Sequence, residues 1–468
     1  MTSLAASLAK HERFARLRTG LATMEERDWL CWSLYGAWAL FTAWVFLHAN
    51  AVSFDERWFL KDTQQASPIG ALSAGAYLGY GQFYWVLLSA MPSALAARLI
   101  WLGFYLATPL VMALSVKRRM QIYVIGAWLA MPAAWWYGKI IGPEIPNLFL
   151  CALAMALLMR GRLVWAGFVI GAAIGIKVLA APLVLIFLWP LIEAPRKNFP
   201  ILMKAAGAAL LGFVFINPGL LLDPGHILGQ ILFASGTKNT EWTQIHDVLS
   251  NAHMQWDMVQ TGGLAQFIMP APFLLAFFLV ARFHETPSPL LIAAGTSLLA
   301  FLAIFMIPDR FLGWYWLPAL PIVLMLIGRM ARPGRALTPL IAASAVFNLP
   351  VVSISVHEKL DQIRVTSNNA IVSECLATAL QDELITDVLD HSEFGGLDLP
   401  EIPGSYIEYR GLWGGDWSHL FLGQRMVGSD VGRRVLGVPN MQMVRDCGGV
   451  MVFRREDIHQ QLLARQQT

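Results

Sequence analysis

The sequence contains little charge. Asp, Glu, Lys and Arg together make up 14% of its 468 residues, whereas about 25% is usual for a globular protein. Over most of the chain this shortage excludes an ordinary soluble domain, because such a domain needs a charged surface. The net charge of +3 also gives no reason to expect nucleic acid as a partner, since nucleic-acid-binding proteins present a strongly basic face.

Other signals are absent as well. We find no internal repeat, no low-complexity tract and no pattern of a cleavable signal peptide. Residues 1–28 are polar and amphipathic, with Lys10, Arg13, Arg16 and Arg18 ahead of the first apolar run. This pattern predicts a cytoplasmic amphipathic segment before an uncleaved first span.

Long hydrophobic runs are what the sequence has in abundance. Hydrophobic residues make up 56% of the chain, and the mean hydropathy is +0.54. The runs recur along residues 29–355 with short basic loops between them, which predicts an all-α polytopic membrane domain of about eleven crossings. Because Lys and Arg collect in cytoplasmic loops, the N-terminus is predicted inside and the C-terminal part outside. The expected location is a plasma membrane, such as the inner membrane of a bacterium.

The run from Leu163 to Ile192 is interrupted by a single charge, Lys177. Basic residues flank both of its ends, at Arg160–Arg162 and at Arg196–Lys197, so both ends are predicted on the inner side. An even number of crossings is then required, and we expect a hairpin that turns near Lys177. Each arm of about 14 residues is about 21 Å long, which is shorter than the bilayer core of about 30 Å. Lys177 should therefore be recessed below the outer surface.

The composition changes to that of a soluble protein from His357 onward. Residues 356–468 are predicted to form a small α/β domain outside the membrane. A helix is expected at Glu374–Leu384, and two strands are expected at Met441–Arg445 and Val450–Phe453. The predicted division of the chain is therefore 1–28, 29–355 and 356–468.

Two of the four cysteines, Cys375 and Cys447, lie in this outer domain. An oxidising compartment would allow them to form a disulfide. Two free thiols are the alternative, because spacing in the sequence does not fix the distance between their Cα atoms. Cys31 and Cys151 lie in predicted spans, where buried apolar cysteines are expected.

Polar residues on the predicted outer side form the candidate site. Asp55 and Glu56 directly follow the first span, and Glu144 and Lys177 lie at later outer turns. Charges at a membrane face are costly unless water or a partner charge meets them. A carboxylate there can deprotonate a hydroxyl. The apolar stretch from Gly81 to Met91 either lies along the interface or begins a span, so the number of crossings within residues 81–115 is left open.

Two later outer segments add further polar residues. Asp309 and Arg310 follow a predicted span, and a cation there can stabilise a leaving phosphate. Residues 217–263 contain His226, His246 and His253. The spacing of these three histidines matches no strong metal motif.

Taken in order, these motifs resemble those of GT-C membrane glycosyltransferases, which use sugars linked to polyprenyl phosphate. The resemblance covers about residues 25–355 and includes a stretch found in several GT-C mannosyltransferases. The matching motifs, in chain order, are Asp55-Glu56, Gly79-Tyr80-Gly81-Gln82-Phe83-Tyr84, Gly142-Pro143-Glu144, the Gly-rich span Gly167–Lys177, and Asp309-Arg310-Phe311 followed by Leu317–Pro321. Some relatives have an Arg before the second acid, where this sequence has a Gly-Pro pair.

The resemblance implies a role for each matching residue. Asp55 would be the general base that activates an acceptor hydroxyl for inverting attack on the anomeric carbon. Glu56 and Glu144 would orient the acceptor or a divalent ion, and Lys177 and Arg310 would hold the lipid phosphate. Asp309, Tyr84 and His246 complete the set of candidate substrate-binding residues. The implied partners are a polyprenyl-phosphate sugar donor, a glycan, lipid or protein acceptor, and membrane lipids. No cofactor is required, and a divalent cation is optional.

Each candidate also has a purely structural interpretation. Asp55 could be an N-cap, Glu144 an exposed loop charge and Lys177 an interfacial anchor. Asp309 and Arg310 could form a local ion pair. Histidines in a long loop are more often loop residues than ligands.

Two other functions remain open from the sequence. A secondary transporter of an anionic lipid or solute would also hold charges in the membrane, although such proteins often have internal repeats. An envelope polysaccharide ligase or polymerase would carry Arg and His in a large outer loop such as residues 217–263.

Overall fold

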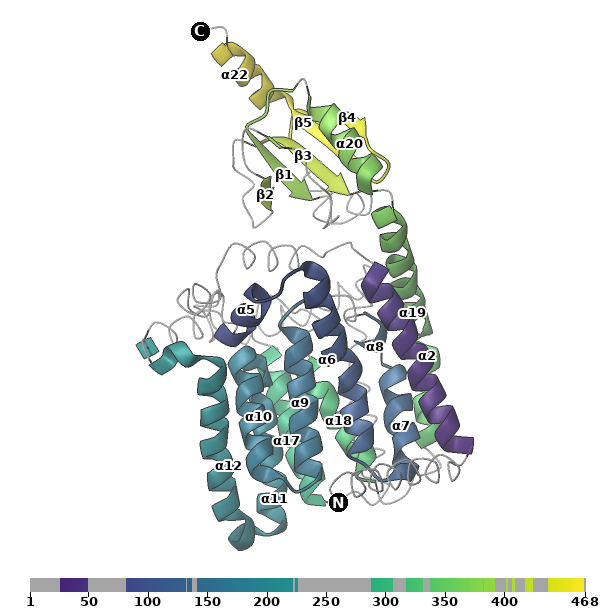
Figure 1. Ribbon diagram of the computed structural model, residues 1–468, viewed down its shortest axis with the longest axis vertical. Helices are drawn as coiled ribbons and strands as arrows, with labels where there is room; N and C mark the ends of the chain where they lie inside the picture. Colours follow the sequence, from purple (N-terminus) through teal and green to yellow (C-terminus); the bar gives the residue numbers. More distant parts are fainter. Residues whose placement is uncertain are drawn as a thin grey trace, which may run out of the picture.

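The computed structural model has two parts, a bundle of helices and a sheet domain, joined by α19 (Leu337–Ser367) (Figure 1). We call the end of the bundle that faces the sheet domain its upper end, and the opposite end its lower end. The chain is mostly helical with a small C-terminal sheet, as the sequence predicts. The structure describes residues 26–48, 81–131, 133–136, 141–221, 224–225, 288–305, 317–330, 337–367, 369–381, 383–391, 401–402, 406–408, 417–423 and 437–466.

Among the described residues, the bundle consists of α-helices and two 3₁₀ segments. In addition to α19, they are α2 (Glu26–His48), α5 (Gln82–Ser89), α6 (Ala94–Leu114), α7 (Arg118–Leu129), α8 (Ala133–Trp136), α9 (Glu144–Met159), α10 (Leu163–Ile176), η2 (Val178–Phe187), α11 (Leu188–Glu193), α12 (Pro195–Ile216), η3 (Pro218–Leu221), α17 (Ser288–Phe305) and α18 (Leu320–Gly328). The eight-residue α5 is about 12 Å long. It is a separate short helix at the upper end, and both alternatives for this stretch stay predictions.

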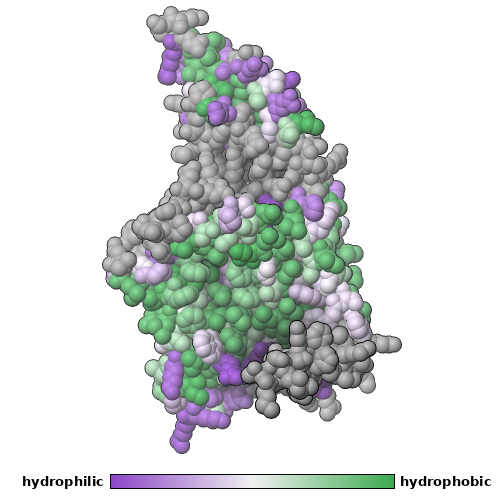
Figure 2. Space-filling view, in the orientation of Figure 1, coloured by the Kyte–Doolittle hydropathy of each residue, from purple (hydrophilic) through white to green (hydrophobic). Residues whose placement is uncertain are grey.

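Three described helices are long and apolar enough to cross a membrane: Trp29–His48, Leu95–Leu114 and Pro195–Ile216. The other apolar helices among the described residues are shorter, with 10–17 residues. Figure 2 shows an apolar band across the visible face of the bundle, with hydrophilic residues at its lower end. The band agrees with a membrane protein, whereas the predicted count of about eleven crossings is not confirmed.

The packing of α10 against α12 confirms the predicted hairpin around Lys177. Gly167 of α10 lies against Ala205 of α12, and Gly171, one turn higher, lies against Ala209. The two helices are therefore parallel, so the chain between them must return from the upper to the lower end. η2 and α11 make this return over about 20 Å and about 9 Å. The return arm is longer than predicted because a 3₁₀ helix rises more per residue.

Glycines allow α10 and α12 to approach closely. A Cβ atom at Gly171 would overlap the carbonyl oxygen of Ala209, and one at Gly212 would overlap that of Phe168. Small residues at such contacts let helix backbones meet inside a membrane. The Gly-rich sequence of α10 is thus explained by packing, and this packing sets the height of its last residue, Ile176, beside α12.

Two arginine side chains cap the lower ends of α6 and α9 by hydrogen bonds to their last carbonyls. The Arg160 guanidinium donates to the carbonyl of Leu114 at 2.8 Å, and that of Arg329 donates to Met159 at 2.9 Å. These carbonyls end α6 and α9, where no intrahelical partner remains for them. Arg329 also lies 4.6 Å from the ring of Trp189. Basic loops that the sequence assigns to one side of the membrane therefore meet at one end of the bundle.

The C-terminal domain contains a five-stranded sheet in the order β2-β1-β3-β5-β4. β1 is parallel to β2 and β3, whereas β5 is antiparallel to both β3 and β4. Leu376, Val388, Phe421, Val450 and Val452 are buried in the core between α20 and the sheet. The elements are α20 (Asn369–Leu380), β1 (Asp387–His391), β2 (Tyr406–Glu408), β3 (Trp417–Gly423), β4 (Met441–Asp446), β5 (Val450–Arg455) and α22 (Glu456–Gln466).

Two local predictions for this domain are confirmed. Cys375 and Cys447 form a disulfide, with Cα atoms 5.6 Å apart. The predicted strand pair is present as β4 and β5, which are antiparallel neighbours. Cys31 and Cys151 are buried free thiols, as expected.

Two helices differ from the prediction at their ends. α20 ends at Leu380, one turn before the predicted end. The chain turns there toward the sheet, where Glu383 accepts hydrogen bonds from Arg454 of β5 at 2.9 and 3.0 Å. α19 continues to Ser367, past the domain boundary predicted after residue 355.

Candidate active site at the upper end of the bundle

Two of the predicted site residues meet at the upper end of the bundle. The Lys177 ammonium and the Glu144 carboxylate form an ion pair. Their side chains are only 11% and 14% exposed, respectively. Opposite charges in contact make such burial tolerable, because each compensates for the water that the other has lost. The sequence placed both residues on one face of the membrane but did not predict that they are paired.

The helix ends favour both charges. Glu144 is the first residue of α9, where the helix dipole stabilises an anion, and Lys177 directly follows α10, where the dipole stabilises a cation. Because α9 and α10 are consecutive and antiparallel, these two ends lie together. Each dipole contributes about 0.3–1 kcal/mol. Backbone dipoles therefore add to the mutual attraction of the pair.

Asn147 holds the end of α10 beside Glu144. It lies one turn further along α9, so the two residues share a face of the helix. Its Nδ2 donates to the carbonyl of Ala173 at 2.6 Å, and the backbone N–H of Lys177 donates to the same oxygen at 3.0 Å. Asn147 is almost completely buried. The sequence analysis missed it, although the polar pair Glu144 and Asn147 at helical spacing in an apolar run is a usable signal.

Tyr84 lies in an aromatic cluster beside this site. Its ring centroid is 5.3 Å from that of Trp85 and 5.8 Å from that of Trp101, and it is buried. Trp101 Nε1 donates to the carbonyl of Gly142 at 2.7 Å, just before Glu144. The cluster thus supports the start of α9 from the side of α6. The predicted contact of Tyr84 with substrate stays a prediction.

Arg98 is a buried cation that the sequence analysis did not select. It lies on α6, one turn above Trp101, and is 5% exposed. Its Nη1 donates to the carbonyl of Phe46 at 3.4 Å, near the end of α2. A single Arg within an apolar run was the available signal, because intramembrane charges are rarely kept without a partner. Arg98 joins α6 to α2 just before the segment that contains Asp55.

Several predicted site residues lie outside the described part of the chain. They are Asp55, Glu56, His246, Asp309 and Arg310. The structure therefore does not test whether they lie near the Glu144–Lys177 pair, and their roles stay predictions.

A divalent ion was one predicted ligand of the acidic residues. Among the described residues, no group of three His, Cys, Asp or Glu side chains could hold a metal ion. The Glu144 carboxylate is paired with an ammonium group, which opposes a second cation at the same oxygens. The described residues at this site do not fit a metal, and the reaction proposed below uses none.

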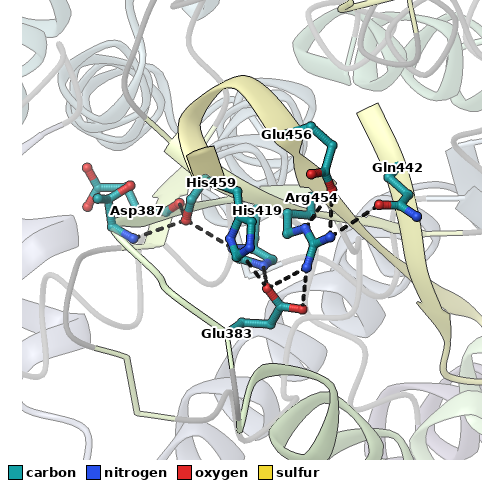
Figure 3. Close-up of polar contacts among 9 residues, drawn as sticks. Glu383, Asp387, His419, Gln442, Arg454, Glu456 and His459 are labelled. Carbon is teal, nitrogen blue, oxygen red and sulfur yellow. Dashed lines mark hydrogen bonds and ion pairs between the residues drawn. The ribbon is translucent and has the colours of Figure 1, made fainter. Parts of the chain in front are cut away.

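A second polar cluster lies in the sheet domain (Figure 3). Glu383 is gripped by Arg454 and lies 3.5 Å from Nε2 of His419 and 3.9 Å from Nδ1 of His459. On the other side of the first imidazole, the Ser418 hydroxyl lies 2.9 Å from Nδ1 of His419. His419 thus lies between the Ser418 hydroxyl and the Glu383 carboxylate.

Burial argues against catalysis by this cluster. Ser418 and His419 are both 0% exposed, so no substrate reaches the hydroxyl. Burial also lowers the pKa of His419 to about 4, although the nearby Glu383 opposes this shift. His419 is therefore neutral at pH 7. The cluster joins β3, β5 and α22 as a structural network.

Comparisons with known proteins find similar solved structures, among them two structures of one protein. No family model matches the sequence, and no curated protein matches it. The chain aligns with ArnT from Cupriavidus metallidurans bound to undecaprenyl phosphate at 13% identity and a TM-score of 0.48, over 92% of this chain and 98% of that one. The apo state of the same protein aligns at 13% identity and a TM-score of 0.46, over 91% and 98%. Scores below 0.5 at this identity establish neither a family nor an activity.

Proposed function

We propose that the protein is a membrane glycosyltransferase that moves a sugar from a polyprenyl-phosphate carrier to an acceptor hydroxyl at the upper end of the bundle. The observation that carries the proposal is the buried Glu144–Lys177 pair at the adjacent ends of α9 and α10. A cation held below the membrane surface suits a phosphate whose lipid tail lies in the bilayer. In this proposal the upper end is the extracytoplasmic face, and the membrane is the inner membrane of a bacterium.

Lys177 is proposed to bind the phosphate of the carrier. An ammonium group has three donors, so it can contact the Glu144 carboxylate and a phosphate oxygen at the same time. Negative charge on the phosphate grows as its bond to the sugar breaks, and the contact with Lys177 then strengthens. The low dielectric around a buried cation increases this effect. Glu144 acts by fixing the position of the ammonium.

Asp55 is proposed as the general base, as the resemblance implies. The acceptor oxygen attacks the anomeric carbon, and its proton passes to the Asp55 carboxylate. The bond between that carbon and the phosphate oxygen breaks, and its electron pair leaves with the phosphate. A single displacement of this kind inverts the anomeric configuration. The remaining proposed contacts with donor or acceptor are Glu56, Tyr84, His246, Asp309 and Arg310.

Release of free polyprenyl phosphate by the purified protein in lipid nanodiscs tests the proposal. The donors are polyprenyl phosphates that carry different single sugars, and the acceptors are supplied as extracted glycans and lipids. Lys177→Met should slow release by about 10- to 100-fold, the value expected for losing a charge-assisted hydrogen bond. Lys204→Met is the matched control, because this lysine is exposed on α12 well below the upper end.

Two results would count against the proposal. Equal rates for wild type and Lys177→Met would remove Lys177 from the reaction. No release from any donor, combined with uptake of an anionic solute by proteoliposomes, would favour the transporter instead.

A further inference from the structure

One side-chain amide, that of Asn217, joins the start of α5 to the upper ends of α10 and α12. Figure 1 shows these three helices meeting at the upper end of the bundle. Its Oδ1 accepts the backbone N–H of Gln82 at 3.2 Å. Its Nδ2 lies 3.1 Å from the carbonyl of Gly175 and 3.2 Å from that of Phe213. Asn217 and Gln82 are both fully buried. We call the following set of residues the upper clasp: Gly81, Gln82, Gly175, Asn217 and Gly219.

Two more hydrogen bonds complete the upper clasp. The N–H of Gly219 donates to Oε1 of Gln82 at 2.6 Å, and the N–H of Gly81 donates to the carbonyl of Ile176 at 3.2 Å. The elements are also in close contact, because a Cβ atom at Gly81 would overlap the carbonyl oxygen of Gly175. A different arrangement of these helix ends therefore requires the backbone to move.

Lys177 is the next residue after the carbonyls that the upper clasp holds. The last carbonyls of a helix have no partners within it. At the end of α10, the carbonyl of Gly175 accepts from the side chain of Asn217, directly after α12. The carbonyl of Ile176 accepts from the backbone N–H of Gly81, just before α5. The backbone of Lys177 then leaves the helix in an extended conformation, with φ −151° and ψ 118°. The direction of its side chain toward Glu144 thus follows from how the end of α10 is fixed.

We propose that Asn217 is a positioning residue for Lys177, an inference that rests on the function proposed above for that site. Asn217 makes no contact with the ammonium among its hydrogen bonds to Gln82, Gly175 and Phe213. It holds the end of α10 so that the ammonium meets Glu144 and, during the reaction, the lipid phosphate. Without the amide, the end of α10 shifts, Lys177 becomes more accessible, and phosphate binding weakens.

Asn217→Ala is the test variant, and Asn348→Ala is its matched control. Asn348 is equally buried and also donates to a carbonyl at the upper end of a helix, that of Ala130 after α7, at 2.6 Å. The control therefore removes the same kind of hydrogen bond without touching α10. Should Asn217→Ala fail to fold, Asn147→Ala takes its place, because Asn147 holds the same helix end from α9.

The first measurement is the rate at which an amine-reactive ester labels Lys177 in the purified protein. Peptide mass spectrometry gives this rate relative to the exposed Lys117 in the same sample. We expect the ratio to rise by about fivefold in Asn217→Ala, as the loss of its one hydrogen bond to α10, at Gly175, allows, and to stay unchanged in Asn348→Ala. An unchanged ratio in Asn217→Ala, or an equal rise in both variants, would overturn the inference.

The second measurement is the affinity of the same variants for undecaprenyl phosphate in nanodiscs. Asn217→Ala should bind about fivefold more weakly than wild type, and Asn348→Ala should bind like wild type. Equal affinity of Asn217→Ala and wild type, with measurable binding, would overturn the positioning role. Wild type that does not bind this lipid would contradict the proposed function, while the labelling ratio still decides whether Asn217 positions Lys177.

Discussion

Removing Lys177 alone should destabilise the protein more than neutralising both members of its ion pair. In Lys177→Met, the Glu144 carboxylate loses its partner, the Lys177 ammonium. It remains in a largely buried position, where its side chain is 14% exposed in the wild type. Breaking a buried ion pair from one side costs about 3–5 kcal/mol. Some exposure remains here, and the dipole of α9 still stabilises the carboxylate by about 0.3–1 kcal/mol. We therefore expect the free energy of unfolding to fall by about 2–3 kcal/mol.

The double variant Glu144→Gln/Lys177→Met carries no charge at this position. It should lie within about 1 kcal/mol of wild type, because neutral replacements of a buried pair are often tolerated. Because Glu144→Gln alone is not expected to stabilise the protein, the double-mutant cycle then gives a coupling energy of at least about 1 kcal/mol between the two side chains. Denaturant unfolding in detergent of fixed composition measures it, with the exposed Lys204→Met as control. Additive effects, with coupling below about 0.5 kcal/mol, would refute the buried ion pair.

Three further predictions concern other parts of the molecule. Gly171→Leu should lower thermal stability because the new side chain overlaps the backbone of α12, whereas Gly207→Leu, which meets open space, should not. Changing Cys375 and Cys447 together to Ser should destabilise the sheet domain by about 4 kcal/mol, the entropy estimate for a disulfide that closes 72 residues; an unchanged melting temperature would contradict this. Burial lowers the pKa of His419 from 6.5 to about 4, so the unfolded chain gains its proton first. The free energy of unfolding of the sheet domain should therefore be highest above pH 6.5 and should decrease as the pH falls from 6.5 to 4. In His419→Gln it should depend less on pH. Equal profiles for both proteins would oppose the buried neutral histidine.

The sequence was sufficient where a short pattern determines the structure. Basic residues on both sides of the run from Leu163 to Ile192 predicted a hairpin, and the parallel packing of α10 and α12 confirms that the chain reverses direction between them. The disulfide of the sheet domain and the strand pair of β4 and β5 could also be predicted, because their signals are local or limited to few alternatives. The number of membrane crossings could not be predicted in this way, because many of the described apolar helices are shorter than a bilayer is thick.

The contacts of the site could not be predicted from the sequence. Glu144 and Lys177 are 33 positions apart, and their pairing depends on how α9 and α10 are rotated relative to each other. Gln82 and Asn217 are 135 positions apart, and their hydrogen bond requires the start of α5 and the end of α12 to lie at the same height. Hydrophobic periodicity indicates which face of a helix is buried but not which helix lies opposite.

The central claim is that the paired ends of α9 and α10 bind a lipid phosphate through Lys177. The most direct test is the dissociation constant of undecaprenyl phosphate for wild type, Lys177→Met and Lys204→Met in the same nanodiscs. The account predicts binding by wild type and Lys204→Met, and binding at least about tenfold weaker for Lys177→Met, as the loss of a charge-assisted hydrogen bond requires. Equal dissociation constants for wild type and Lys177→Met, or no binding by wild type, would contradict it.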